Sequence, residues 1–179
     1  MALPKLNTPT YELELPSTGE KIKYRPFLVK EQKILMMAEE SEKEEEIMET
    51  MGKLVSSCTF DKIDVNDSPL FDIEYIFLQL RSKSVGETAK LNIICPDDKK
   101  TSVPVNVKLE DINVQMQKDH TNEISITDNI KLFMGYPKLS DIKKSESENE
   151  INQMFNIMNQ CVKEIHYGDD IYHKIDITD

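Results

Sequence analysis

The most reactive side chains of this sequence, three histidines and three cysteines, lack any catalytic or metal-binding spacing. They are His120, His166, His173, Cys58, Cys95 and Cys161. A structural zinc site needs paired ligands that converge, and Cys95 begins C-P-D-D rather than C-x-x-C. His166 and His173 could meet across a terminal hairpin near Asp169 and Asp170, but no further ligand completes a known spacing. We predict no metal and no cofactor, and interpret the cysteines as buried thiols in a reducing compartment.

Enzyme signatures are missing as well. Nucleophilic catalysis needs a serine or cysteine beside a histidine and an orienting acid, and no serine lies in a G-x-S-x-G context. Glycoside hydrolysis needs two carboxylates around a sugar cleft, which usually contains aromatic residues, whereas this chain has no tryptophan. Five glycines leave little room for a phosphate-binding loop. We therefore predict that the protein is not an enzyme and binds no small-molecule substrate.

The most informative segment, residues 68–87, joins an apolar helix to a charged turn. Ser68 suits the N-cap of this helix and Pro69 its first position. Ile76 and Leu78 make the helix apolar nearly all round, which indicates burial on several sides. Four residues at helical spacing form the predicted structural core, namely Leu70, Ile73, Phe77 and Leu80.

The residues that follow this helix have two interpretations, and both could hold together. In the first, Arg81, Lys83, Ser84, Gly86 and Glu87 form a charged loop that contacts other proteins. The second treats the segment as a helix C-terminus, where the basic side chains interact with the helix dipole and the glycine makes the turn. The contact interpretation predicts that Arg81→Glu leaves the fold intact and weakens assembly.

A family resemblance rests on this segment and an earlier one. The sequences FDIEYIFLQLRSKSVGE (residues 71–87) and YELELPSTGEKIKYRPFLVKEQKILMMAEES (residues 11–41) resemble the baseplate hub protein family of T-even-type tailed phages. The resemblance covers roughly residues 11–137. It implies a small protein of the contractile-tail baseplate hub, or one that assists its assembly, with other hub or tail proteins as partners. It also implies that the full-length chain continues beyond Asp179 into a further helical segment.

The resemblance leaves open a structural subunit retained in the virion baseplate and an assembly chaperone that leaves. A hub-associated cell-wall hydrolase is an alternative from another class, with no residue in its favour. The formal net charge of −11 disfavours nucleic acid and anionic membranes as partners. No run approaches the roughly 20 apolar residues of a membrane span. We expect the protein in the host cytoplasm during assembly and, if it is retained, in the tail baseplate.

Periodicity predicts an α+β fold of short antiparallel β-hairpins packed with three or four amphipathic helices. We expect an extended arm at residues 1–10, a main α+β domain at residues 11–137, and a C-terminal helix plus hairpin at residues 138–179. Residues 11–24 and 89–109 alternate as hairpins, each with one buried face. Pro104 cannot donate to a ladder, so its strand should lie at an edge, where another chain could add a strand.

Further elements are expected on either side of these hairpins. Residues 27–57 should form two helices, separated near the acidic run at residues 39–46. The second helix should carry an apolar stripe of Ile47, Met51, Leu54, Val55 and Cys58. Strand character is predicted around Ile63 and Val65 and again at residues 112–116, and residues 132–138 are interpreted as a contact loop or core cover. Ser145 and Glu148 fit a capping box that opens a C-terminal helix, and residues 165–177 suggest a last hairpin.

Overall fold

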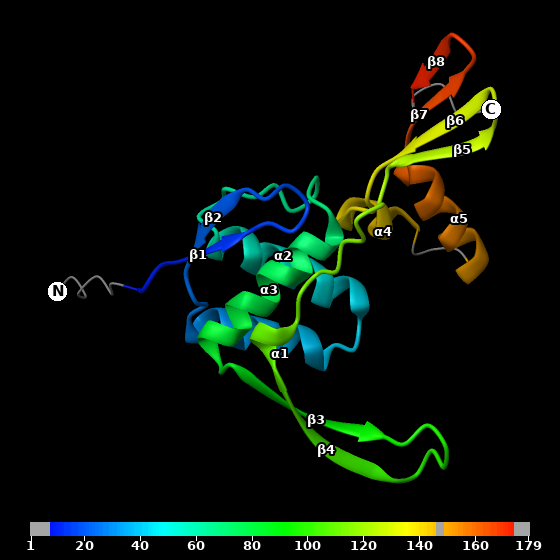
Figure 1. Cartoon of the computed structure of the whole chain (residues 1–179). Coiled ribbons are helices and arrows are strands. Elements are labelled where there is room, and N and C mark those ends of the chain that lie inside the picture. The colour runs from blue at the N-terminus through cyan, green and yellow to red at the C-terminus, as the bar shows by residue number, and fades with distance from the viewer. Residues whose placement is uncertain (1–7, 146–148, 174–179) are drawn as a thin grey trace. The chain divides into compact units, whose positions relative to one another are not determined.

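Figure 1 shows the computed structural model of the protein, which describes residues 8–145 and 149–173. The fold is α+β, as predicted. Its described part contains five α-helices and eight short strands, and neighbouring strands in every sheet are antiparallel. Three or four helices were expected. The additional helix is α4 (Leu139–Ser145), where the sequence shows no clear apolar period.

The chain divides into two compact units. The first contains Met1–Val65 and Phe71–Val114, and the second contains Asn66–Leu70 and Gln115–Asp179. This division differs from the boundary expected after residue 137. The physical reason is a four-stranded sheet of the second unit, which joins strands from both sides of that position.

The N-terminal hairpin of the first unit forms as expected. Strands β1 (Tyr11–Glu14) and β2 (Lys21–Tyr24) pair with Leu13 opposite Ile22. Both of these side chains are buried, while the charged residues next to them in each strand face water. This alternation is typical of a strand with one covered face. The predicted hairpin at residues 11–24 is therefore confirmed.

Two helices follow, separated by a short break as predicted. They are α1 (Val29–Glu40) and α2 (Glu44–Cys58). Between them Glu42 has φ +56°, which interrupts helical geometry. The predicted stripe on α2 packs inward, because Met51, Leu54, Val55 and Cys58 are all buried.

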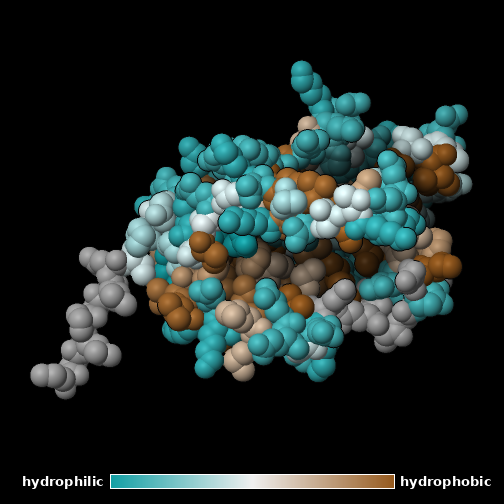
Figure 2. Space-filling model, turned by 90° about the horizontal axis from the view of Figure 1, so that it is seen from below, coloured by the Kyte–Doolittle hydropathy of each residue, from teal (hydrophilic) through white to brown (hydrophobic). Residues whose placement is uncertain are grey.

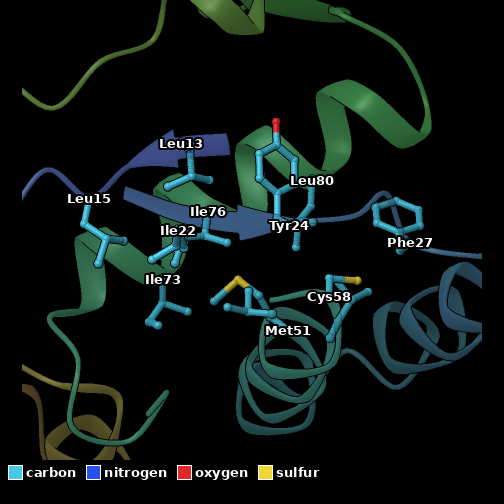
Figure 3. Packing of buried hydrophobic residues seen from close by; sticks show 12 residues of the cluster. Leu13, Leu15, Ile22, Tyr24, Phe27, Met51, Cys58, Ile73, Ile76 and Leu80 are labelled. Carbon is cyan, nitrogen blue, oxygen red and sulfur yellow. The ribbon is translucent and has the colours of Figure 1, made fainter. Parts of the chain in front are cut away.

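Helix α3 (Leu70–Ser84) forms the centre of the core, but its buried face is not quite the predicted one. Ile73, Ile76 and Leu80 are fully buried, whereas Leu70 and Phe77 are only partly buried. Figure 3 shows Ile73, Ile76 and Leu80 beside the side chains of the N-terminal hairpin and of α2. Ile73 and Leu80 are thus buried as predicted, whereas Ile76 takes the place of Phe77, because the hairpin and α2 together cover the side of α3 that carries Ile76.

Two predicted local structures are wrong. Residues 63–65 and 112–116 form no strand; they lie in turns and irregular backbone. Of the two interpretations of residues 132–138, the contact loop does not hold for residues 132–134, which belong to β6 (Ile130–Met134), one of the two inner strands of the second unit's sheet. The whole segment is half-buried. Gly135 and Pro137 follow the end of β6 and do not indicate a longer loop.

The sheet of the second unit has the order β5-β6-β7-β8. Its other strands are β5 (Glu123–Thr127), β7 (Val162–Tyr167) and β8 (Asp170–His173). The pairing of β7 with β8 confirms the terminal hairpin up to residue 173, and residues 174–177 of that prediction lie outside the described part.

Helix α5 (Glu150–Cys161) leads directly into β7. Its N-cap is Asn149, whose side chain accepts a hydrogen bond from the backbone N–H of Asn152 at 2.9 Å. The predicted cap residue Ser145 instead ends α4, and Glu148 lies outside the described residues. Asn and Ser are equally favourable N-caps, and this helix begins after Asn149 rather than after Ser145.

Candidate protein-binding surface

Of the two interpretations of the charged segment, the structure agrees with the helix C-terminus, because most of the segment is helical. Helix α3 continues through Arg81, Lys83 and Ser84, so only Gly86 and Glu87 of the predicted interaction residues lie beyond it. The Ser84 hydroxyl donates to the Leu80 carbonyl at 2.6 Å and accepts from the Phe27 backbone N–H at 2.9 Å. These two hydrogen bonds connect the end of α3 to the segment that precedes α1, so Ser84 has a structural role.

The basic residues of this last turn differ in their surroundings. Lys83 forms an exposed ion pair with Glu87 at 2.6 Å, and its ammonium lies 5.8 Å from the centre of the Tyr11 ring. The Glu87 carboxylate raises the pKa of Lys83. The atom Nη1 of Arg81 is instead buried and has no hydrogen-bond partner among the described residues. Arg81→Glu would place a carboxylate in this buried environment, so it does not test surface contact cleanly.

Gly86 is the point at which the chain leaves α3. Its φ of +151° lies in a region that other residues rarely adopt. Immediately after it, the Glu87 carbonyl accepts a hydrogen bond from the Leu109 N–H at 2.9 Å. Leu109 is buried, so this bond and this side chain anchor the base of the following hairpin.

That hairpin is a two-stranded arm, which we call the β3–β4 arm and define as residues 88–108. It consists of β3 (Thr88–Ile94) and β4 (Ser102–Lys108), and Figure 1 shows it extending from the end of α3. The predicted hairpin is confirmed, but its predicted buried face is wrong. None of the 21 residues of the arm is buried.

One face of the arm is an uncovered apolar ladder. Cross-strand neighbours on this face are Ala89 with Val107, Leu91 with Val105, and Ile93 with Val103. The exposed fractions of Leu91, Ile93 and Val103 are 50%, 51% and 50%. Figure 2 shows hydrophobic side chains open to the surface between hydrophilic ones on one side of the molecule. An isolated two-stranded hairpin is marginally stable in water, so this ladder is suited to packing against another surface.

The charge of the arm is opposite to that of the chain. Four lysines against two aspartates leave it with a net charge of +2, whereas the whole chain carries −11. One of the two aspartates, Asp98, is used inside the turn, where it accepts hydrogen bonds from the backbone N–H groups of Lys100 and Thr101 at 2.9 Å. The hydrogen bond from the Thr101 hydroxyl, together with these two backbone bonds, lowers the pKa of Asp98 to about 2. The turn at the tip of the arm carries Lys99 and Lys100.

Pro104 lies in the middle of β4, opposite Asn92. Both strands of a two-stranded sheet are edges, so the predicted edge position of Pro104 is confirmed. Because proline has no N–H, it also interrupts the row of donors that another strand would need for continuous pairing.

Each of the three histidines contacts a neighbouring side chain. His120 stacks on Tyr136, with 3.0 Å between Nε2 and the phenol oxygen. His166 and His173 meet at Glu164, at 2.9 Å and 3.6 Å from its carboxylate oxygens. Within the described residues, no group of three histidine, cysteine or acidic side chains is placed to hold a metal ion. No helix among those residues is both long enough and apolar enough to span a bilayer.

Lys83 and Glu87 therefore pair where α3 leads into the arm, and Gly86 lies between them in the chain. Pro104 lies farther along the arm, opposite Asn92. One nitrogen of Arg81 is buried, and Ser84 is hydrogen-bonded within the fold. Sequence reasoning missed the exposed residues Leu91, Ile93 and Val103 as binding candidates. Apolar and polar residues alternate in the same way whether the apolar face of a strand is covered or exposed, so the alternation did not reveal the exposure. The only available signal was the cluster of lysines in and beside the turn.

The family model for the T4 bacteriophage base plate protein matches residues 8–179. The chain belongs to the T4 bacteriophage base plate protein family. Searches of curated proteins and of solved structures found no match for this base plate protein. Family membership supports a role in the tail baseplate together with other baseplate proteins.

Proposed function

We propose that this base plate protein acts in assembly of the baseplate hub by binding other hub or tail proteins, without catalysis. The β3–β4 arm is its principal binding surface. The observation that carries the proposal is the apolar ladder, three cross-strand pairs long, on an arm without a single buried residue.

Physical chemistry favours an acidic partner surface with an apolar centre. Burial of the ladder supplies the free energy of binding, since exposed apolar area contributes about 25 cal/mol per Å² when it is removed from water. The four lysines of the arm then steer the encounter and select against basic surfaces. Gly86 and the Glu87–Leu109 hydrogen bond hold the arm at the end of α3.

A matched pair of variants tests the arm. Ile93→Asp places a carboxylate on the apolar face, and Asn92→Asp adds the same charge at the adjacent position, which points to the opposite face. Tagged full-length protein is expressed in infected cells, and captured hub proteins are identified by mass spectrometry. We expect Ile93→Asp to lose hub proteins and Asn92→Asp to retain them, with both variants folded. Equal capture by the two variants would show that the ladder is not the binding surface.

The same experiment separates a retained subunit from an assembly chaperone. Proteomic analysis of purified virions is run beside the capture. Presence in virions identifies a structural hub component, whereas capture of hub proteins without presence in virions identifies a chaperone that leaves. A zymogram of the purified protein on cell-wall substrate tests the hydrolase alternative.

A further inference from the structure

A second apolar surface lies on α5, in the unit that does not contain the arm. Four large side chains recur at helical spacing and form one stripe. They are Ile151, Met154, Phe155 and Met158, with exposed fractions of 64%, 54%, 60% and 51%. A helix stripe of this kind normally packs against a core. Here it is open to solvent, so it is a surface that another molecule can cover.

The composition of α5 distinguishes this stripe from other exposed apolar residues. Residues 151–162 contain no charged side chain, although 31% of the whole chain is charged. The polar positions in this range are asparagine and glutamine, and the one charged residue of α5 is Glu150 at its N-terminus. Interface cores in proteins are depleted of Lys, Glu and Asp and enriched in Met and aromatic residues, which is the composition found here.

We propose that the uncharged apolar stripe of α5 (Ile151, Met154, Phe155 and Met158) is a self-association surface that pairs with the same stripe of a second copy. Two chains that each carry −11 repel one another over most of their surfaces. Contact through the stripe of α5 brings together residues that carry no charge. The side-chain amides next to the stripe both donate and accept hydrogen bonds, so they can pair with their own symmetry mates.

A two-fold arrangement follows from this self-complementarity. In an isologous dimer the same patch is used by both copies, and such dimers are the commonest oligomers. A partner selected by charge would gain nothing from the stripe, because none of its four residues is charged. The inference is independent of the function proposed for the β3–β4 arm, which lies in the other unit.

Sedimentation equilibrium of the purified full chain tests the proposal. We expect a reversible monomer–dimer equilibrium with a Kd of about 1–100 μM, since a single helix face is a small interface. Raising NaCl from about 0.1 M to about 1 M shortens the Debye length from about 10 Å to about 3 Å. We therefore expect salt to strengthen the dimer severalfold, because it screens the repulsion between the two acidic chains.

Variants locate the surface. Phe155→Glu is expected to raise the Kd at least about tenfold, the equivalent of about 1.4 kcal/mol. Two controls add a negative charge elsewhere, namely Gln153→Glu on the other side of α5 and Val29→Glu at an exposed position of α1. Both controls should dimerise like the parent. Should Phe155→Glu prove unfolded by circular dichroism, Met158→Asn removes apolar surface without introducing charge.

Three results would overturn the proposal. The first is a monomer at every concentration, and the second is a dimer indifferent to both Phe155→Glu and Met158→Asn. The third is a dimer that salt weakens, which would indicate pairing between opposite charges, such as those of the arm and an acidic surface. If Ile93→Asp loses capture of hub proteins while its dimerisation is unchanged, the β3–β4 arm and the α5 stripe are separate binding surfaces.

Discussion

Arg25 donates two hydrogen bonds to the carboxylate of Glu31. Its Nη1 lies 2.9 Å from Oε2 and its Nη2 lies 2.8 Å from Oε1, with only 14% and 10% of the two side chains exposed. Glu31 also accepts hydrogen bonds from the Leu28 backbone N–H at 2.6 Å and from the Ser57 hydroxyl at 3.2 Å. The pair therefore links the chain after β2 to the first turn of α1 and to the last turn of α2.

We expect Arg25→Ala to lower the free energy of unfolding by about 3–5 kcal/mol, because it leaves a buried carboxylate without its counter-ion. Lys53→Ala is the matched control. Its ion pair with Glu49 has a similar length of 2.6 Å, but the lysine side chain is 75% exposed. Breaking an exposed pair costs at most about 1 kcal/mol. Urea denaturation of the three proteins measures both values, and equal losses would contradict the structural importance of the Arg25–Glu31 pair.

The same pair predicts how stability depends on pH. The hydrogen bonds from Arg25 lower the pKa of Glu31 to about 2 from its usual 4.5, against an opposing effect of burial. A lowered pKa in the folded state stabilises the protein above about pH 4.5, and this contribution disappears as the pH falls towards 2. It amounts to about 3 kcal/mol at neutral pH.

Glu31→Gln tests this pH dependence. The variant should be less stable than the parent at pH 7, and the difference should shrink between pH 4.5 and pH 2, because the parent carboxylate becomes protonated in that range. Thermal unfolding over this pH range measures the difference. A constant difference at all pH values would mean that the titration of Glu31 is not linked to folding.

Burial on α3 yields a further prediction. Ile76 is fully buried between the hairpin and α2, so Ile76→Ala should cost about 2–5 kcal/mol of unfolding free energy. Ile34 of α1 has the same side chain but is 56% exposed, and Ile34→Ala should stay within about 0.5 kcal/mol. Denaturant titration compares the two. A small effect at Ile76 would place the core elsewhere than on this face of α3.

Local patterns predicted most of the individual elements. The hairpin at residues 11–24 and the stripe of α2 were readable because side-chain periods of 2 and 3.6 depend only on neighbouring residues. Prediction failed where a different kind of information decides. Residues 112–116 alternate without a partner strand, and Gly135 and Pro137 obscured the strand β6. Strand pairing is non-local, so alternation alone cannot identify it.

The candidate surfaces illustrate the same limit. The sequence showed that Leu91, Ile93 and Val103 alternate with polar residues, but the identity of the covered face depends on what packs there. Arg81 was predicted to contact either a partner protein or the dipole of its own helix, and the structure directs one of its nitrogens inward. Chemical type predicts what a side chain can do, while the neighbouring elements decide whether it can reach a partner.

The sequence by itself determined the α+β class, the acidic charge, the turn at Gly86, the edge character of Pro104 and the resemblance to phage baseplate proteins. Only the tertiary structure decided that Arg25 and Glu31 form a buried pair, that Ile76 rather than Phe77 is fully buried, and that the β3–β4 arm and α5 leave apolar faces uncovered. The physical reason is that composition and period are local properties. Burial and exposure instead arise from contacts between segments far apart in the chain.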